Sequence, residues 1–311
     1  MLYFKLIPMK KYLMRTLGAT VLCLCAWNIK AQQQPLFSQY MFNGMVINPA
    51  YPSMDESSSL TAVGRNQWVG VDGAPKTATA SFYTPVKATN TSLGFSLMNE
   101  KITVNSQTAV NLNVSQRVKL SEKIYLAMGL KGGMTQYRED NSRLSISDPV
   151  FANNQSYWKT DVGFGFMVFT DRFFIGLSTP IFKSFDLGSK MNKVVVESHY
   201  YLQTGYLLNI NNDVKLKPNI LLRQVKGAGF QYDLNMNILL KNLVWLGASW
   251  RSEKTITGLV QVQLTKNLQL GYSYDSPMES NLKGAQTVSH EVMLNYRFSW
   301  SKWKVVAPRY F

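Results

Sequence analysis

The sequence predicts an all-β protein: a transmembrane, up-and-down antiparallel β-barrel of about 14 strands, with an N-terminal plug or periplasmic segment. Three observations predict it. The chain opens with an export signal, apolar and polar residues alternate along most of its length, and no later apolar stretch reaches the ~20 residues of a membrane-spanning helix. A chain that crosses a bilayer without such helices must form a closed barrel, because open sheet edges cannot be satisfied in hydrocarbon.

Residues 1–31 have the features of a secretory signal peptide. Basic residues precede a short apolar run at 17–27, and Ala31 is the small residue expected before the cleavage site. The run is too short to span a bilayer. A signal peptide that begins at Met9 has a more regular basic region than one that begins at Met1. The sequence leaves open which methionine is the true start. The basic residues before the run are Lys5, Lys10, Lys11 and Arg15.

Removal of the first 31 of 311 residues leaves 280, enough for one large β domain. Cys23 and Cys25 leave with the signal, which excludes a disulfide-stapled fold and a thiolate metal site in the mature chain. The net charge falls from +15 to +10, because the signal holds five basic and no acidic residues. This excess suggests anionic partners, such as outer-membrane lipid and lipopolysaccharide or an acidic protein. Export of the chain argues against nucleic acid as the partner.

The alternation that predicts the barrel runs from residue 59 to 299 and is clearest at 229–240. There the even-numbered positions are apolar and most odd-numbered positions are polar, which a strand aligns on two faces and a helix would scatter. A large soluble β-sandwich or solenoid would show the same alternation. The export signal and the turn lengths therefore favour the barrel over these folds. The predicted strands cover 59–68, 76–83, 92–99, 108–118, 123–136, 160–170, 172–178, 199–210, 214–224, 229–240, 243–252, 254–264, 267–275 and 288–299.

The connections predict which end of the barrel faces the periplasm. Tight polar turns follow even-numbered strands, as periplasmic turns do, and longer connections follow odd-numbered strands, as outer loops do. The tight turns lie at 171–172, 211–213, 241–242 and 265–267, and the longer connections lie at 137–159, 179–198 and 276–287. Linkers 225–228 and 252–254 are short on the outer side, so the rule is imperfect.

Two terminal segments stand apart from the barrel. Segment 32–58 lacks clean alternation, and Pro49 argues against an interior strand there. Its aromatic residues favour either a plug in the lumen or a periplasmic segment that contacts a partner. The aromatic and basic tail 300–311 is either an interfacial anchor or a variable end with no role. Phe298 or Phe311 could serve as the terminal aromatic residue for barrel assembly.

The mature chain offers little catalytic chemistry. Its histidines are His199 and His290, and His290 precedes Glu291 as in a zinc-protease motif, but Leu294 stands where a second histidine is required. Ser289 cannot share a proton with His290, because neighbours on a strand face opposite ways. No nucleophile elbow or phosphate-binding loop is found. The sequence predicts no enzymatic activity, no cofactor and no metal site.

Several motifs resemble the PorP/SprF family, and together they span essentially the whole mature chain. They are 37–43 (FSQYMFN), 47–51 (INPAY), 65–70 (RNQWVG), 73–77 (GAPKT), 216–218 (LKP), 225–228 (VKGA), 233–235 (DLN), 245–252 (WLGASWRS), 271–275 (GYSYD) and 289–294 (SHEVML). The sequence departs from the family at Gly44, where a proline is common, and in its extension past Phe298.

The resemblance implies an outer-membrane component of the type IX secretion system of Bacteroidota. It implies support for export, for surface anchoring of large adhesins and for gliding. The implied partners are the periplasmic secretion ring or the C-terminal docking domain of an adhesin.

Eight residues are candidates for a polar cluster that fixes strand ends or the N-terminal segment. They are Asn48, Pro49, Arg65, Gln67, Trp68, Asp275, His290 and Glu291. For each of them the alternative is a cross-strand pair inside the barrel without partner contact.

Two rival functions remain open at this point. One is a solute-transporting barrel with anion preference, favoured by Lys215, Lys217, Arg223 and Arg297 on inward registers. The other is a purely structural barrel without a ligand.

Overall fold

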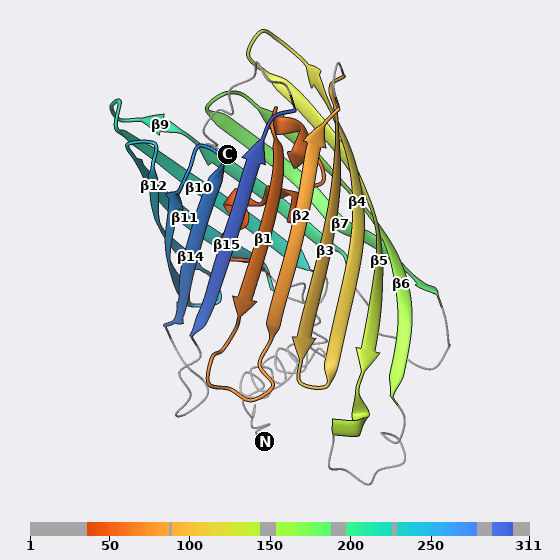
Figure 1. Cartoon of the computed structure of the whole chain (residues 1–311). Coiled ribbons are helices and arrows are strands. Elements are labelled where there is room, and N and C mark those ends of the chain that lie inside the picture. The colour runs from red at the N-terminus through yellow and green to blue at the C-terminus, as the bar shows by residue number, and fades with distance from the viewer. Residues whose placement is uncertain are drawn as a thin grey trace, which may run out of the picture.

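The computed structural model describes residues 36–86, 89–143, 154–187, 197–225, 229–278 and 288–300. The predicted signal peptide, 1–31, lies outside these residues. Within them, 15 strands form one antiparallel sheet (Figure 1). Apart from β8 and β9, strands adjacent in sequence pair with each other, and β15 pairs with β1 from Ser58↔Phe298 to Asn66↔His290. This last pairing closes the sheet, which confirms the predicted up-and-down barrel.

The strands are longer on one side of the barrel than on the other. They are β1 (Ser58–Asn66), β2 (Lys76–Pro85), β3 (Thr91–Ile102), β4 (Asn105–Lys119), β5 (Tyr125–Glu139), β6 (Gln155–Phe169), β7 (Phe173–Leu187), β8 (His199–Tyr206), β9 (Leu208–Asn209), β10 (Val214–Val225), β11 (Gln231–Leu240), β12 (Val244–Arg251), β13 (Thr255–Gln263), β14 (Leu268–Pro277) and β15 (Ser289–Phe298).

Strands β8 and β9 are two pieces of one crossing, because both pair with β10. The described strands therefore make 14 crossings, the number that the alternation predicts. The interruption lies at Leu207. The register places Tyr206 opposite Pro218 of β10, and proline has no N–H to donate to a neighbouring strand. The missing donor accounts for the break in the ladder.

The wall is apolar outside and polar inside. Leu112 of β4 and Leu130 of β5 expose 65% and 62% of their surface on the outer face, whereas Asn113 and Asn235 are buried on the inner face. A water-soluble sheet would bury the leucines instead. The observed distribution is that of a barrel whose outer face meets hydrocarbon.

Two expected outer loops need correction. The sequence predicted connections over 137–159 and 179–198, but β5 extends to Glu139, β6 begins at Gln155 and β7 extends to Leu187. The register shifts opposite Val162 and Phe164 because β7 carries two extra residues there, and Thr179, Pro180 and Ile181 are buried in succession, which interrupts the alternation in β7. A proline such as Pro180 usually marks the end of a strand. Here it packs against Gly163 at this irregularity, and a side chain at position 163 would not fit.

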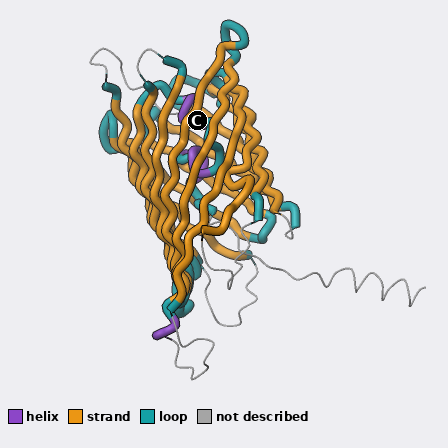
Figure 2. The backbone as a smooth tube through the Cα atoms, turned by 90° about the vertical axis from the view of Figure 1, so that its right-hand side faces the viewer, coloured by secondary structure: helices purple, strands orange, loops and turns teal. Residues whose placement is uncertain are grey.

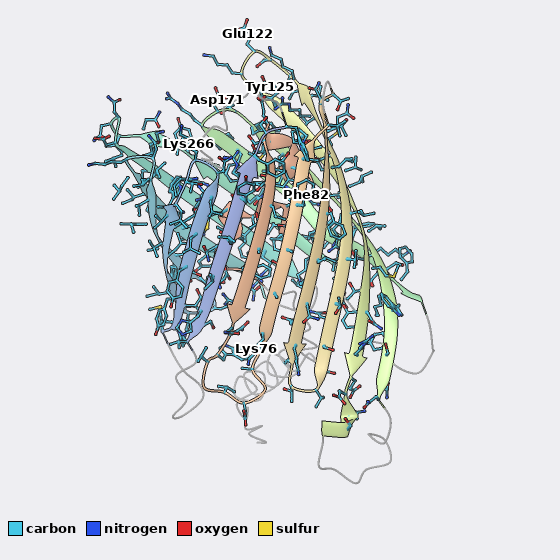
Figure 3. All side chains as sticks on the ribbon, in the orientation of Figure 1. Lys76, Phe82, Glu122, Tyr125, Asp171 and Lys266 are labelled. Atoms are coloured by element: carbon cyan, nitrogen blue, oxygen red, sulfur yellow. The ribbon has the colours of Figure 1, made fainter. Side chains whose placement is uncertain are left out.

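One end of the barrel carries only short turns, as predicted, whereas the other carries the longer loops together with two short connections, 103–104 and 252–254. Figure 3 shows Glu122, Asp171 and Lys266 in the short turns at one end and Lys76 at the other. We call the first end the turn end and the second the loop end. In barrels of this class, the turn end faces the periplasm and the loop end faces outward.

Aromatic side chains gather where β15 ends at the turn end. The ring of Phe298 stacks on that of Phe82 with centroids 6.4 Å apart, and Trp300 packs edge-on against Phe298 at 5.3 Å. This is the position of an interfacial aromatic girdle. The rest of the predicted tail, 301–311, lies outside the described residues.

Short helices lie within the ring of strands (Figure 2). They are the 3₁₀ turns η1 (Tyr40–Phe42), η2 (Gly44–Val46) and η3 (Tyr51–Met54), and a further turn, η4 (Asn141–Arg143), follows β5 at the loop end. No helix in the described part of the chain is long and apolar enough to cross a membrane. We call residues 36–57, which contain the first three turns, the plug.

Candidate functional site

The plug fills the lumen and touches distant parts of the wall. Its buried side chains form two apolar clusters with inward-facing residues. In one, Phe42 packs edge-on against Trp245 of β12, with ring centroids 5.8 Å apart. In the other, Tyr51 packs edge-on against Tyr83 of β2 at 6.2 Å. Burial of such large rings makes the plug part of the protein core rather than a loosely inserted tail.

Five buried charged residues surround the beginning of the plug. We call them the charged cluster, which comprises Arg65 of β1, Asp233 of β11, Arg251 of β12, Asp275 of β14 and Glu291 of β15. The Glu291 carboxylate accepts the backbone N–H groups of Ser38 at 2.7 Å and Gln39 at 2.9 Å. The Ser38 hydroxyl donates to Asp275 at 2.7 Å and accepts from Arg65 at 2.8 Å. The wall thus binds both the backbone and the hydroxyl of one plug residue.

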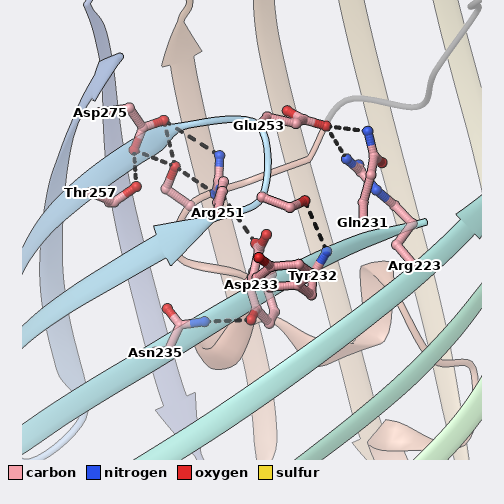
Figure 4. A network of polar contacts seen from close by, with 12 residues as sticks. Arg223, Gln231, Tyr232, Asp233, Asn235, Arg251, Glu253, Thr257 and Asp275 are labelled. Carbon is pink, nitrogen blue, oxygen red and sulfur yellow. Dashed lines mark hydrogen bonds and ion pairs between the residues drawn. The ribbon is translucent and has the colours of Figure 1, made fainter. Parts of the chain in front are cut away.

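Ion pairs connect the charged cluster across the seam between the first and last strands. Arg65 and Glu291 are register partners and form an ion pair at 3.1 Å, and Arg65 also reaches Asp275 at 2.6 Å. Arg251 lies between Asp233 and Asp275, as Figure 4 shows, and pairs with Asp233 at 3.1 Å. Three carboxylates thus face two guanidinium groups, and hydrogen bonds from the plug help to compensate the excess negative charge.

Tyr40 extends this network into the plug. Its hydroxyl accepts a hydrogen bond from the Asn235 amide of β11 at 2.6 Å. Burial raises the pKa of the Tyr40 hydroxyl well above its ordinary value, and the nearby negative charge of Asp233 adds to the effect. The hydroxyl therefore stays neutral and tolerates the apolar surroundings of its ring.

A pair of glycines receives the middle of the plug. Gly129 of β5 and Gly165 of β6 are register partners, and we call them the glycine floor. A side chain at position 129 would overlap the backbone of Pro49, and one at position 165 would overlap the side chain of Asn48. The Asn48 amide donates to the backbone carbonyl of Phe166 at 3.2 Å. The two glycines thus permit a close approach that larger residues would prevent.

The end of the plug is held near the turn end. Arg297 of β15 donates to the Asp55 carboxylate at 2.7 Å, and the Tyr83 hydroxyl donates to the same carboxylate at 2.7 Å. Between the two ends, the ammonium group of Lys217 lies 5.3 Å from the centroid of the Phe42 ring, a cation–π distance. Inward-facing cations of the wall therefore contact the plug.

The predicted site residues divide between two anchors. Arg65, Asp275 and Glu291 come together in the charged cluster. Asn48 and Pro49 lie instead on the glycine floor, further along the plug. The plug is thus held at separate positions rather than by one cluster.

Three other predicted residues lie elsewhere. The backbone N–H of Gln67 donates to the Pro75 carbonyl at 2.9 Å, within the loop between β1 and β2, and Trp68 is exposed in the same loop. His290 precedes the inward-facing Glu291 on β15, so its side chain lies on the outer face. Its Nδ1 lies 2.7 Å from the Tyr272 hydroxyl. These three side chains do not join the charged cluster.

Sequence reasoning missed Ser38, Asp233 and Arg251 as members of this arrangement. The alternation did place Asp233 on the polar face of its segment, and a buried charge there requires a partner. No local pattern identifies Ser38, because Asp275 and Glu291 lie more than 200 positions away in the sequence and Arg65 lies on a different element, 27 positions away. In the described part of the chain, no group of three or more histidine, cysteine, aspartate or glutamate side chains is arranged to hold a metal ion.

Comparison with known proteins gives one family match and several distant structures. The family model described as type IX secretion system membrane protein PorP/SprF matches residues 29–296. The comparison with curated proteins gives no match.

Solved structures with a similar fold include three outer-membrane proteins. Omp33 of Acinetobacter baumannii is 10% identical, with 79% of this chain and 100% of that chain covered and a TM-score of 0.46. The toluene transporter TbuX of Ralstonia pickettii is 8% identical, with coverage of 83% and 93% and a TM-score of 0.49. A FadL homologue of Pseudomonas aeruginosa is 12% identical, with coverage of 86% and 95% and a TM-score of 0.47. We draw no functional conclusion from such distant similarities.

Proposed function

Because the chain belongs to the PorP/SprF family of type IX secretion system membrane proteins, we propose that its plugged barrel anchors exported adhesins at the cell surface. Family membership makes it an outer-membrane component of that system and implies contact with the secretion machinery. In the proposal, the barrel binds the C-terminal docking domain of a large adhesin at the loop end and contacts the periplasmic ring of the machinery at the turn end. It performs no catalysis.

The occupied lumen is the observation that carries the proposal. The plug contacts β1, β14 and β15 through Ser38, β6 through Asn48 and β12 through Phe42. A lumen filled in this way offers no evident path for a solute. The surfaces left for a partner are the loops, the turns and the rims, which suit a protein that holds other proteins.

The cations that suggested anion transport support the same view. Arg223 pairs with Glu253 at 2.7 Å, and the Lys215 ammonium donates to the Asn242 amide oxygen at 2.9 Å in a turn. These groups, like the inward-facing cations that contact the plug, have partners within the protein. They do not line an open positively charged channel of the kind that selects anions.

Deletion of the gene tests the proposal. We expect one or more large exported proteins to disappear from the cell surface and to accumulate in the culture fluid, with return to the surface on complementation by the wild-type gene. The comparison uses surface labelling and mass spectrometry of both fractions. Normal display of every exported protein in the deletion strain would contradict the proposal and favour the purely structural barrel.

A further inference from the structure

The loop between β1 and β2, residues 67–75, is fixed from both sides. The Val69 N–H donates to the Val288 carbonyl at 2.8 Å, just before β15. The Thr103 N–H, in the turn between β3 and β4, donates to the Gly73 carbonyl at 2.9 Å. We call residues 67–75 the rim loop. Its backbone is bonded to both neighbouring hairpins, so its shape is set before any partner arrives.

Two apolar side chains of the rim loop are exposed in spite of this order. Trp68 and Val69 expose 43% and 44% of their surface. Trp68 has a φ of 50°, in the left-handed region that bulky residues rarely occupy, and its N–H donates to the Ser289 hydroxyl at 3.2 Å. A strained backbone that presents a large apolar ring is typical of a functional position. A small polar residue at position 68 would strain the backbone less and expose less apolar surface, so folding alone does not explain the tryptophan.

The position of the rim loop argues against burial of the exposed ring in the hydrocarbon layer. From β1 to β4, the outward-facing residues in one register row at the loop end are polar, as expected beyond the hydrocarbon, whereas on the other side of β1 the row continues through His290 of β15 to Tyr274 of β14. The polar part of the row comprises Asn66 of β1, Lys76 of β2, Lys101 of β3 and Ser106 of β4. Trp68 follows Asn66 beyond this row, at the end where Figure 3 places Lys76. Trp68 therefore lies past the polar residues of β1 to β4, and together with the adjacent Val69 it forms an apolar patch of the kind that can bind another protein.

We propose that the rim loop is the surface on which the exported protein docks, with Trp68 as its central anchor. This inference rests on the proposed function and names the surface that performs it. The partner offers an apolar pocket for the indole, bordered by carboxylates. Lys76 and Lys101 flank the rim loop and are both exposed, and Asp72 is the acidic residue within it. The flanking cations would increase the association rate with an acidic face and would do so less at high salt.

The experiment measures surface retention of the exported protein that the deletion strain loses. In the strain carrying Trp68→Ala, we expect at least about tenfold weaker retention, because a buried tryptophan at the centre of an interface is a typical hot spot. Trp68→Asn is a second variant that suits a left-handed backbone and lacks the ring, so it should fold at least as well and lose retention equally. Trp250→Ala is the matched control, since Trp250 is 44% exposed on the outer face of β12.

Two further measurements identify the partner and the role of charge. A photo-reactive amino acid in place of Val69 should crosslink the same exported protein in intact cells. Lys76→Glu combined with Lys101→Glu should lower retention in a salt-dependent way, whereas Lys123→Glu at the turn end should not. Barrel amount and heat-modifiable migration on gels verify that each variant folds.

The outcomes separate the docking surface from the proposed function. If the deletion strain loses the exported protein but both Trp68 variants retain it at the wild-type level, the rim loop is not the docking surface and the proposed function stands. If the deletion strain displays all exported proteins normally, the proposed function fails and this inference fails with it.

Discussion

Gly129 of β5 and Gly165 of β6 lie directly opposite each other, and Pro49 of the plug packs against both. Gly129→Ala would place a methyl group where the Pro49 backbone lies. We expect a loss of about 1–3 kcal/mol in the free energy of unfolding, the usual effect of overpacking. Urea unfolding of the barrel in detergent or lipid vesicles measures it. Gly132→Ala on the same strand is the control, because nothing lies within 4 Å of a side chain added there. Equal stability of the two variants would contradict the close contact.

The charged cluster predicts a large difference between two arginine substitutions. Arg65→Met leaves three buried carboxylates with one guanidinium group, and loss of one partner from a buried ion pair costs about 3–5 kcal/mol. Arg117→Met removes a more exposed pair with Glu56, for which we expect about 0–1 kcal/mol. Protease accessibility of the plug gives a second readout. A small effect of Arg65→Met would show that the cluster does not hold the plug.

The outer face predicts a dependence on depth in the membrane. Leu112→Lys places a charge near the middle of β4 on the apolar face, where such changes cost about 2–4 kcal/mol. Ser106→Lys lies on the same face of the same strand, in the polar row at the loop end, and should cost about 0–1 kcal/mol. Unfolding in lipid vesicles compares the two variants. The same cost at both positions would be inconsistent with a bilayer around the middle of the barrel.

The plug predicts a barrel that conducts poorly. In planar bilayers we expect the wild-type protein to be nearly silent and a variant lacking residues 36–57 to show open channels, if it still migrates as a folded barrel on gels. A steady, anion-selective conductance of the wild-type protein would favour the solute-transport alternative instead.

Most strands of the barrel could be predicted from local sequence, because a strand with one apolar face has apolar and polar residues in alternation. This is why every crossing was located and why β11 matches its predicted alternation closely. The ends of β6 and β7 could not be predicted from the same pattern. In β7 the two extra residues opposite Val162 and Phe164 leave 179–181 buried in succession, which hides the period of two, and Pro180 looks like a strand end although Gly163 makes room for it.

The site is less visible in the sequence than the wall. Arg65, Asp275 and Glu291 stand out as charged residues in an alternating pattern, so their inward position could be inferred. Their common partner, Ser38, could not be inferred, because the contact joins residues 253 positions apart and depends on how the plug is seated. Likewise, a glycine in a strand suggests close packing but does not say that Asn48 is the residue that approaches it.

The contacts of the plug with both sides of the closing seam have a consequence for biogenesis. Arg65 and Glu291 pair across that seam, and each also binds Ser38. We therefore expect an N-terminal segment that is already in place to favour closure of the sheet, because it binds the first and the last strand at once.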